Sequence, residues 1–82
     1  MFLDLLSVMT ALHGFETDQG ARIRRHRLAA GLTIPDLANA VGTSAGAVSH
    51  WETGRHTPRR ERQLAIAKAI GVSWSELFGM DS

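Results

Sequence analysis

The residues best suited to chemistry in this sequence are its arginines, which are concentrated in the middle of the chain. Eight of the nine Lys and Arg residues are arginines, and all eight lie between Arg22 and Arg62. Residues 20–62 carry a net charge of +5, whereas residues 1–19 carry −3 and residues 63–82 carry −1. The planar guanidinium group matches phosphate and carboxylate better than an ammonium group does. This distribution makes nucleic acid a reasonable partner, although charge alone fits a solvated basic surface equally well.

The other chemically active side chains do not form a pattern typical of an enzyme or a metal site. The sequence shows no nucleophile–base pair, no paired carboxylates and no glycine-rich phosphate loop, and neighbours on a helix such as Ser49 and His50 point apart. The chain has no cysteine, and its four histidines are not spaced as metal ligands. They are His13, His26, His50 and His56. We therefore expect no enzyme, no cofactor and no metal.

Length and composition favour one small cytoplasmic domain. A chain of 82 residues can bury a modest core, and the lack of disulfides fits a reducing compartment. The first fifteen residues are apolar, but their only charge is Asp4, so they lack the basic start of a signal peptide. The apolar run is also too short to span a bilayer. We expect no membrane association.

Capping residues and glycines predict the helices that must hold the arginines. We expect five helices, each beginning after a side chain that can accept a hydrogen bond from the first turn. The expected caps are Asp18, Thr33, Ser44, Thr57 and Ser73. The residues suited to end the first four helices are Gly31, Gly42, Gly54 and Gly71. No segment alternates as a strand would, so the predicted fold class is all-α.

Apolar residues at helical spacing predict the core of these helices. The second helix should turn Leu37, Ala38 and Val41 inward. The third should bury Ala47, Val48 and Trp51, the fourth Leu64, Ala67 and Ile70, and the fifth Leu77 and Phe78.

Residues 1–17 are expected to form an apolar extension outside this domain. A helix is predicted over residues 2–13, ended by Gly14, because apolar residues recur there at helical spacing. They are Phe2, Leu5, Leu6, Met9 and Leu12. This helix could dock on its own domain or form a homodimer or partner surface. The third alternative is a disordered extension, which an upstream start codon could add because Met9 could also begin the protein.

The second and third predicted helices are separated only by Gly42 and Thr43, which is the spacing of a helix-turn-helix. A longer pattern, G-L-T-x-x-x-L-A-x-x-x-G-x-S-x-x-x-V-S-x-W-E-x-G-x-x-x-P, runs without a gap from Gly31 to Pro58. It closely resembles the lambda-repressor-like helix-turn-helix family of repressors and Cro-type regulators. The resemblance covers residues 18–79, leaving 1–17 and the tail 80–82 outside it.

This resemblance implies a domain that binds double-stranded DNA as a homodimer, with the helix over residues 44–53 in the major groove. By resemblance, the base-contacting positions are Ala45, Gly46, Ser49 and His50. The implied phosphate contacts are Thr33, Ser44, Arg55, Arg59 and Arg60, and the helix N-terminus at Thr57 could add backbone donors. A structural ion pair is implied between Arg27 and Glu52.

The sequence departs from the family pattern at several of these positions. Ala45 and Gly46 have no hydrogen-bonding side chains, so only Ser49 and His50 can read base edges in this way. Ile34 replaces a glutamine that often touches DNA in the family. His26 stands where a core leucine is usual, and we expect it to be partly buried with a carbonyl partner.

The function expected from this resemblance is transcriptional regulation, most simply repression by occupying a two-fold symmetric operator. The alternative is a protein-interaction or antitoxin-like module that keeps the fold and binds a partner protein through the N-terminal helix. Two surfaces are candidates for the dimer contact, the N-terminal helix and the last helix with Trp74 and Leu77. No small-molecule effector is expected.

Overall fold

Five α-helices follow one another in residues 18–79, the part of the chain that the computed structural model describes. They are α2 (Gln19–Ala29), α3 (Ile34–Val41), α4 (Ala45–Glu52), α5 (Arg60–Ile70) and α6 (Trp74–Phe78). No strand occurs among these residues, so the predicted all-α, five-helix fold is confirmed. The helix predicted over residues 2–13 lies outside the described residues.

Four of the five predicted caps form the expected hydrogen bonds. The carboxylate of Asp18 accepts from the N–H of Gly20, and the hydroxyl of Ser44 accepts from the N–H of Ala47. Thr33 and Ser73 each begin a full capping box, in which the acid at the third helical position bonds back to the N–H of the capping residue. Each cap satisfies a backbone donor that the helix leaves without an internal partner.

The predicted cap at Thr57 is wrong, because the N-cap of α5 lies two residues later. Arg59 is the N-cap residue, with no hydrogen bond from its side chain, and the helix starts at Arg60. Pro58 is buried rather than placed in an exposed first turn, and its carbonyl accepts from the side-chain amide of Gln63. Thr57 is therefore part of an extended connection between α4 and α5 and offers no helix N-terminus.

The helices enclose a core to which each of them contributes. Its most deeply buried apolar side chains are Ile23, Leu37, Val48, Ile66 and Leu77. The predicted core position Leu64 is wrong, since this side chain is 49% exposed and Ile66 lies inside instead. Ala67 is buried as predicted, whereas Ile70 is only partly buried. The other predicted inward residues lie in the core or pack against it.

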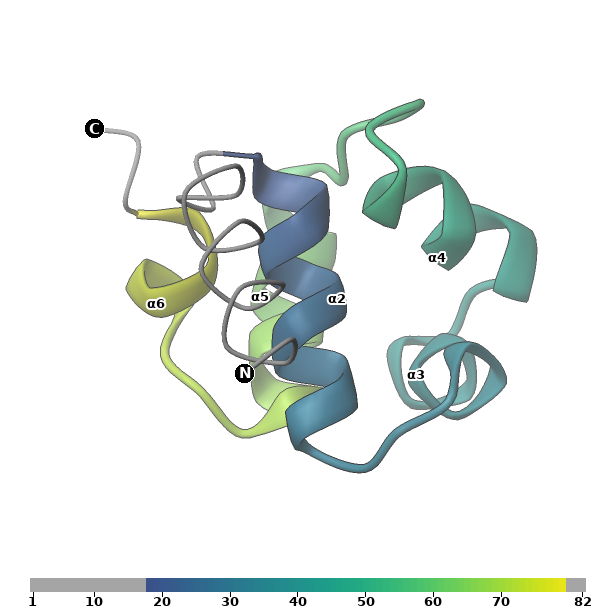
Figure 1. Cartoon of the computed structure of the whole chain (residues 1–82), viewed down its shortest axis with the longest axis horizontal. Helices are drawn as coiled ribbons and strands as arrows, with labels where there is room; N and C mark the ends of the chain where they lie inside the picture. The colour runs from purple at the N-terminus through teal and green to yellow at the C-terminus, as the bar shows by residue number, and fades with distance from the viewer. Residues whose placement is uncertain (1–17, 80–82) are drawn as a thin grey trace, which may run out of the picture.

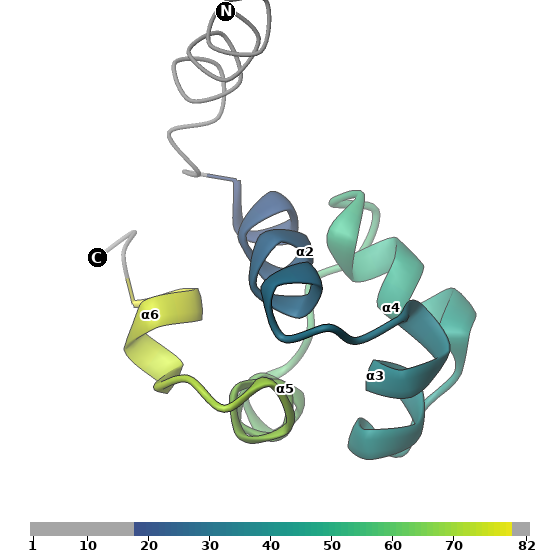
Figure 2. The ribbon, with the colours of Figure 1, turned by 60° about the horizontal axis from the view of Figure 1, so that its bottom comes forward.

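α3 and α4 pack against each other on one side of α2 and α5, and α6 lies on the other side (Figures 1 and 2). α2 contacts both α4 and α6, and α5 contacts both α3 and α6, so these two helices join the two sides. α2 approaches α4 closely at Gly20. A Cβ atom there would lie 2.5 Å from the carbonyl oxygens of Trp51 and Glu52 in α4.

One arginine belongs to the interior and was not anticipated there. Arg22 is fully buried, and its Nε donates to the carbonyl oxygen of Leu77 at 2.6 Å. The bond ties α2 to the C-terminal end of α6, and it removes Arg22 from the surface charges. Within this part of the chain, no helix combines the length and apolarity that crossing a membrane requires.

Candidate nucleic-acid interface

The turn between α3 and α4 is short and tightly bonded. Gly42 ends α3 with φ +83°, a left-handed conformation that glycine adopts without strain. The N–H groups of Gly42 and Thr43 both donate to the carbonyl oxygen of Ala38, each at 2.9 Å. Ser44 then caps α4. Only Gly42, Thr43 and Ser44 separate the two helices, which therefore form a helix-turn-helix unit.

α4 has one face in the core and one face in solvent. Val48, Trp51 and Glu52 are buried, which fixes the rotation of the helix about its axis. Of the four predicted base-contacting residues, Ala45 and Gly46 are exposed in the first turn. Ser49 and His50 are half-buried one turn later. The four residues therefore lie along the outer part of α4 and can be approached together.

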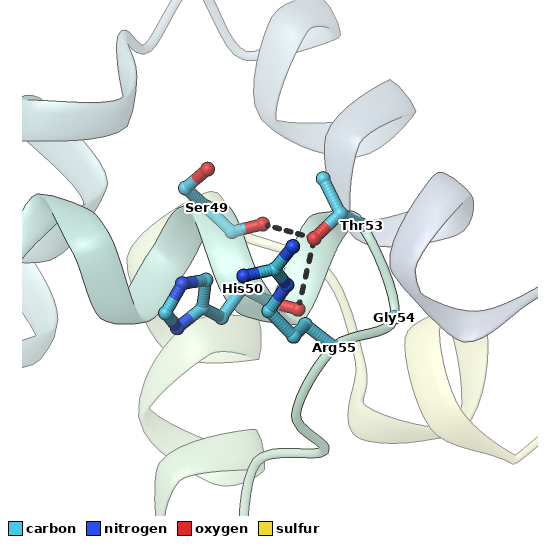
Figure 3. A pocket seen from close by; sticks show the side chains of 5 residues that line it. All are labelled: Ser49, His50, Thr53, Gly54 and Arg55. Atoms are coloured by element: carbon cyan, nitrogen blue, oxygen red, sulfur yellow. Dashed lines mark hydrogen bonds between the residues drawn. The ribbon is translucent and has the colours of Figure 1, made fainter.

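The C-terminal end of α4 forms a polar hollow with the residues that follow it (Figure 3). The hollow is lined by Ser49, His50, Thr53, Gly54 and Arg55. The hydroxyl of Thr53 donates to the carbonyl oxygens of Ser49 at 3.0 Å and His50 at 3.4 Å, as drawn in Figure 3. The N–H groups of Arg55 and His56 also donate to the His50 carbonyl. The rings of His50 and His56 lie with their centroids 5.0 Å apart.

The three arginines predicted to contact phosphate are all exposed, but they differ in their surroundings. Arg55 follows α4 and lines the polar hollow, and Arg59 stands at the start of α5. Arg60 stacks on α6, because its guanidinium carbon lies 4.4 Å from the centroid of the Trp74 ring. A guanidinium over an indole keeps its N–H edge available, so stacking does not prevent contact with an anion.

The two remaining phosphate candidates are the caps of the helix-turn-helix. The hydroxyl oxygen of Thr33 accepts from the N–H of Asp36 at 3.1 Å, and that of Ser44 accepts from the N–H of Ala47 at 3.1 Å. In each case the hydroxyl proton remains available for donation. Both residues are exposed at a helix N-terminus, where backbone donors and the helix dipole favour an anion. At α3 the carboxylate of Asp36 already accepts from the N–H of Thr33, which leaves the Thr33 hydroxyl as the donor there.

Arg27 and Glu52 join α2 to the C-terminal end of α4 through a buried ion pair. Nε and Nη2 of Arg27 donate to the two carboxylate oxygens at 2.6 Å and 3.0 Å. The side chains are 6% and 3% exposed, and Nη1 of Arg27 also donates to the carbonyl oxygen of Leu32. The hydrogen bond with Glu52 raises the pKa of Arg27 above its ordinary value, against the lowering effect of burial. The pair is a bidentate link that holds α4 against α2.

Sequence reasoning missed two neighbouring residues of α5, Arg62 and Gln63, whose side chains bond to segments outside this helix. Nη1 of Arg62 donates to the carbonyl oxygens of Val41 at 3.0 Å and Gly42 at 3.3 Å, in the turn of the helix-turn-helix. Gln63 donates to the carbonyl oxygen of Pro58 at 3.1 Å and accepts from the indole N–H of Trp74 at 2.8 Å. The bonds of Arg62 to the turn and of Trp74 to Gln63 join different helices, so no local pattern could have signalled them. The Gln63–Pro58 bond spans only five positions.

The structure changes the expectation for Leu77 and His26, and it shows a bond within the domain for Trp74. Leu77 is fully buried in the core, which rules out its predicted role as a dimer contact, and Trp74 is half-buried with its N–H bonded to Gln63. His26 is half-buried, but its Nε2 lies 3.3 Å from Nη2 of Arg25 rather than against a carbonyl. The other predicted dimer residues, Phe2, Leu5, Leu6 and Met9, lie outside the described residues.

Comparison with known proteins assigns the helix-turn-helix unit to a protein family. No curated protein and no solved structure shows a significant match to the chain. Residues 19–77 match the family model described as a helix-turn-helix domain, which confirms the resemblance to lambda-repressor-like proteins. Domains of this kind bind DNA and are typically not enzymes. The chain belongs to the helix-turn-helix domain family.

Proposed function

We propose that this protein is a sequence-specific DNA-binding transcriptional regulator that inserts α4 into the major groove. The observation that carries the proposal is the division of α4 into two faces. Its inner face is fixed by Val48, Trp51 and the Arg27–Glu52 pair, while its outer face is open to solvent. A helix held in this way by its own domain can enter the groove without rearranging.

The outer face of α4 offers limited but distinct base contacts. Ser49 and His50 can hydrogen-bond to base edges, and the methyl group of Ala45 can contact a thymine methyl. Gly46 has no side chain, and only the hydroxyl oxygen of Ser44 lies within 4 Å of where its Cβ would be, at 3.9 Å. The backbone of the first turn can thus approach the bases closely. With so few readers, DNA shape and phosphate placement should contribute much of the discrimination.

The proposed phosphate contacts come before and after this face in the sequence. Thr33 and Ser44 present helix N-termini, Arg55 follows α4, and Arg59 and Arg60 begin α5. Phosphate contacts fix register and supply salt-dependent affinity without reading sequence. Together they would hold the outer face of α4 over the major groove.

We further propose that the protein acts in the cytoplasm as a homodimer on a two-fold symmetric operator and represses transcription by occupying it. A single module with few base-reading side chains gains specificity when two copies bind adjacent half-sites. The dimer contact is proposed to involve Trp74 or residues 1–17. The chain would then consist of an extension (1–17), a DNA-binding domain (18–79) and a tail (80–82).

The test is selection of bound sequences from a random double-stranded DNA library at two salt concentrations. We expect an enriched two-fold motif and an affinity that falls steeply with salt. Ser49→Ala and His50→Ala should each relax the preference at one position of the half-site, because each removes one hydrogen-bonding reader. Binding without an enriched motif would contradict sequence-specific regulation, and no binding at low salt would contradict DNA binding altogether.

A further inference from the structure

Arg62 is the one α5 side chain for which the structure records bonds to the turn between α3 and α4. Its Nη1 lies 3.0 Å from the carbonyl oxygen of Val41 and 3.3 Å from that of Gly42. These are the last residue of α3 and its C-cap residue. Arg62 comes from a helix 20 residues further along the chain and is half-buried over the turn.

The two carbonyls are groups that the helix itself leaves without partners. The last carbonyls of any α-helix lack intrahelical donors and carry the negative end of the helix dipole. In this turn the backbone N–H groups of Gly42 and Thr43 are both directed to Ala38 and leave Val41 and Gly42 to another donor. A guanidinium satisfies both carbonyls at once and adds a favourable charge at the C-terminus of α3.

The position of this contact matters because it lies immediately before α4, the helix proposed to enter the major groove. Only Thr43 and Ser44 separate Gly42 from the first residue of α4. Buried residues fix the middle and C-terminal end of α4, at Val48, Trp51 and Glu52. The first turn, with Ala45 and Gly46 exposed, is held to the core only by the partly buried Ala47 and therefore also depends on the turn before it.

We propose that Arg62 is a positioning residue for DNA recognition, which fixes the turn and so the angle at which the first turn of α4 meets the bases. This inference rests on the proposed DNA-binding function. Arg62 differs from Arg55, Arg59 and Arg60 in that its N–H groups are directed at carbonyl oxygens within the protein. Its substitution should therefore reduce discrimination between sequences without removing a phosphate contact.

The experiment compares Arg62→Gln and Arg62→Lys with Lys68→Gln, which removes one positive charge from an exposed position in the last turn of the same helix. The affinity of each full-length protein is measured for the selected DNA site and for an unrelated duplex, over a range of salt. We expect Arg62→Gln to lower the ratio of the two affinities by up to about tenfold, because a bond from a charged donor holds the turn by about that factor and only part of it can appear in binding. The salt slope should stay unchanged, and Arg62→Lys should recover part of the ratio.

Amide hydrogen exchange of the free proteins provides a readout that does not depend on DNA. We expect Arg62→Gln to accelerate exchange at Thr43 and Ala47, on either side of the start of α4, but not at Ile23 in α2. Lys68→Gln should leave all three unchanged. Faster exchange at all three sites, or an unchanged affinity ratio, would reduce Arg62 to a general stabilising residue and overturn the proposal.

A fall in the salt slope of Arg62→Gln would also overturn the proposal, because it would make Arg62 a phosphate contact. If the unsubstituted protein selects no DNA sequence, the proposed function fails. The exchange comparison then still decides whether Arg62 fixes the turn.

Discussion

The buried ion pair between Arg27 and Glu52 makes the stability of the domain depend on single residues. Both are almost fully buried, and removal of one leaves the other charged and without its partner. Breaking such a pair costs about 3–5 kcal/mol, a large part of the stability of a small domain. We therefore expect Glu52→Ala to lower the free energy of unfolding by that amount, measured by urea denaturation.

The control is Glu61→Gln, which removes an exposed carboxylate from the first turn of α5. Its only expected effect is the loss of a favourable interaction with the helix dipole, less than about 1 kcal/mol. Similar losses in the two variants would show that the buried pair contributes no more than a surface charge.

The capping box of α3 makes a pH-dependent contribution through Asp36. The backbone and the hydroxyl of Thr33 hold the pKa of this carboxyl below its ordinary value of 3.8. A depressed pKa in the folded state means that the ionised form stabilises the fold above the unfolded value and that this stability is lost as pH falls through the folded value. We expect Asp36→Asn to lower the Tm at neutral pH.

This difference in Tm between Asp36→Asn and the unsubstituted protein should shrink and disappear as the pH is taken below 3.8. Thermal unfolding followed by circular dichroism at several pH values measures it. A difference that persists in acid would assign the effect to the shape of the carboxyl group rather than to its charge.

At the level of helices, two glycines in α2 and α4 should respond to the same substitution in opposite directions. A Cβ at Gly20 would lie 2.5 Å from two carbonyl oxygens of α4, so Gly20→Ala must push the helices apart and cost about 1–3 kcal/mol. A Cβ at Gly46 meets nothing closer than 3.9 Å, so Gly46→Ala should gain up to about 1 kcal/mol from helix propensity.

Denaturant unfolding of the two glycine variants measures both free energies in one experiment. Because each variant adds one methyl group to a helix, the pair controls for propensity. Equal effects would contradict the close approach of α2 to α4. Gly46→Ala also tests readout, because the added methyl group points into the proposed DNA-facing surface.

Helix positions could be predicted from the sequence where the deciding interactions are local. The caps at Asp18, Thr33, Ser44 and Ser73 bond to residues two or three positions away, so a short pattern contains all that is needed. The start of α5 could not be predicted in this way. A threonine followed by a proline suits a first helical turn, but Pro58 is buried and held by Gln63.

The sequence pattern also could not predict which face of α5 points into the core. Apolar residues occupy nearly every position from Leu64 to Ile70, so helical spacing alone fits more than one inward face. Packing against α3 and α6 selects Ile66 and leaves Leu64 exposed. A charge pattern would place Arg22 and Arg62 in solvent. Their carbonyl partners are 55 and 21 residues away, too far for a local pattern to show.

For the whole molecule, the eight arginines divide by what their guanidinium groups contact. Arg22, Arg27 and Arg62 bond to carbonyls or a carboxylate within the fold. The other five are exposed: Arg24 and Arg25 lie on α2, and Arg55, Arg59 and Arg60 follow α4. A count of basic residues therefore overstates the charge that DNA can meet. The proposed interface depends on the exposed arginines at the start of α5 and at the end of α4.

This division predicts how binding responds to salt when single charges are removed. Removal of one phosphate-binding side chain should reduce the slope of log K against log salt by about 0.9. We expect Arg59→Gln to reduce the slope by about this amount on every duplex, since phosphate contacts carry no sequence information. Lys68→Gln removes the same charge at the opposite end of α5 from the connection to α4 (Figure 1) and should leave the slope unchanged. If both variants reduce the slope equally, DNA responds to net charge rather than to the arginines beside α4, and the proposed interface is wrong.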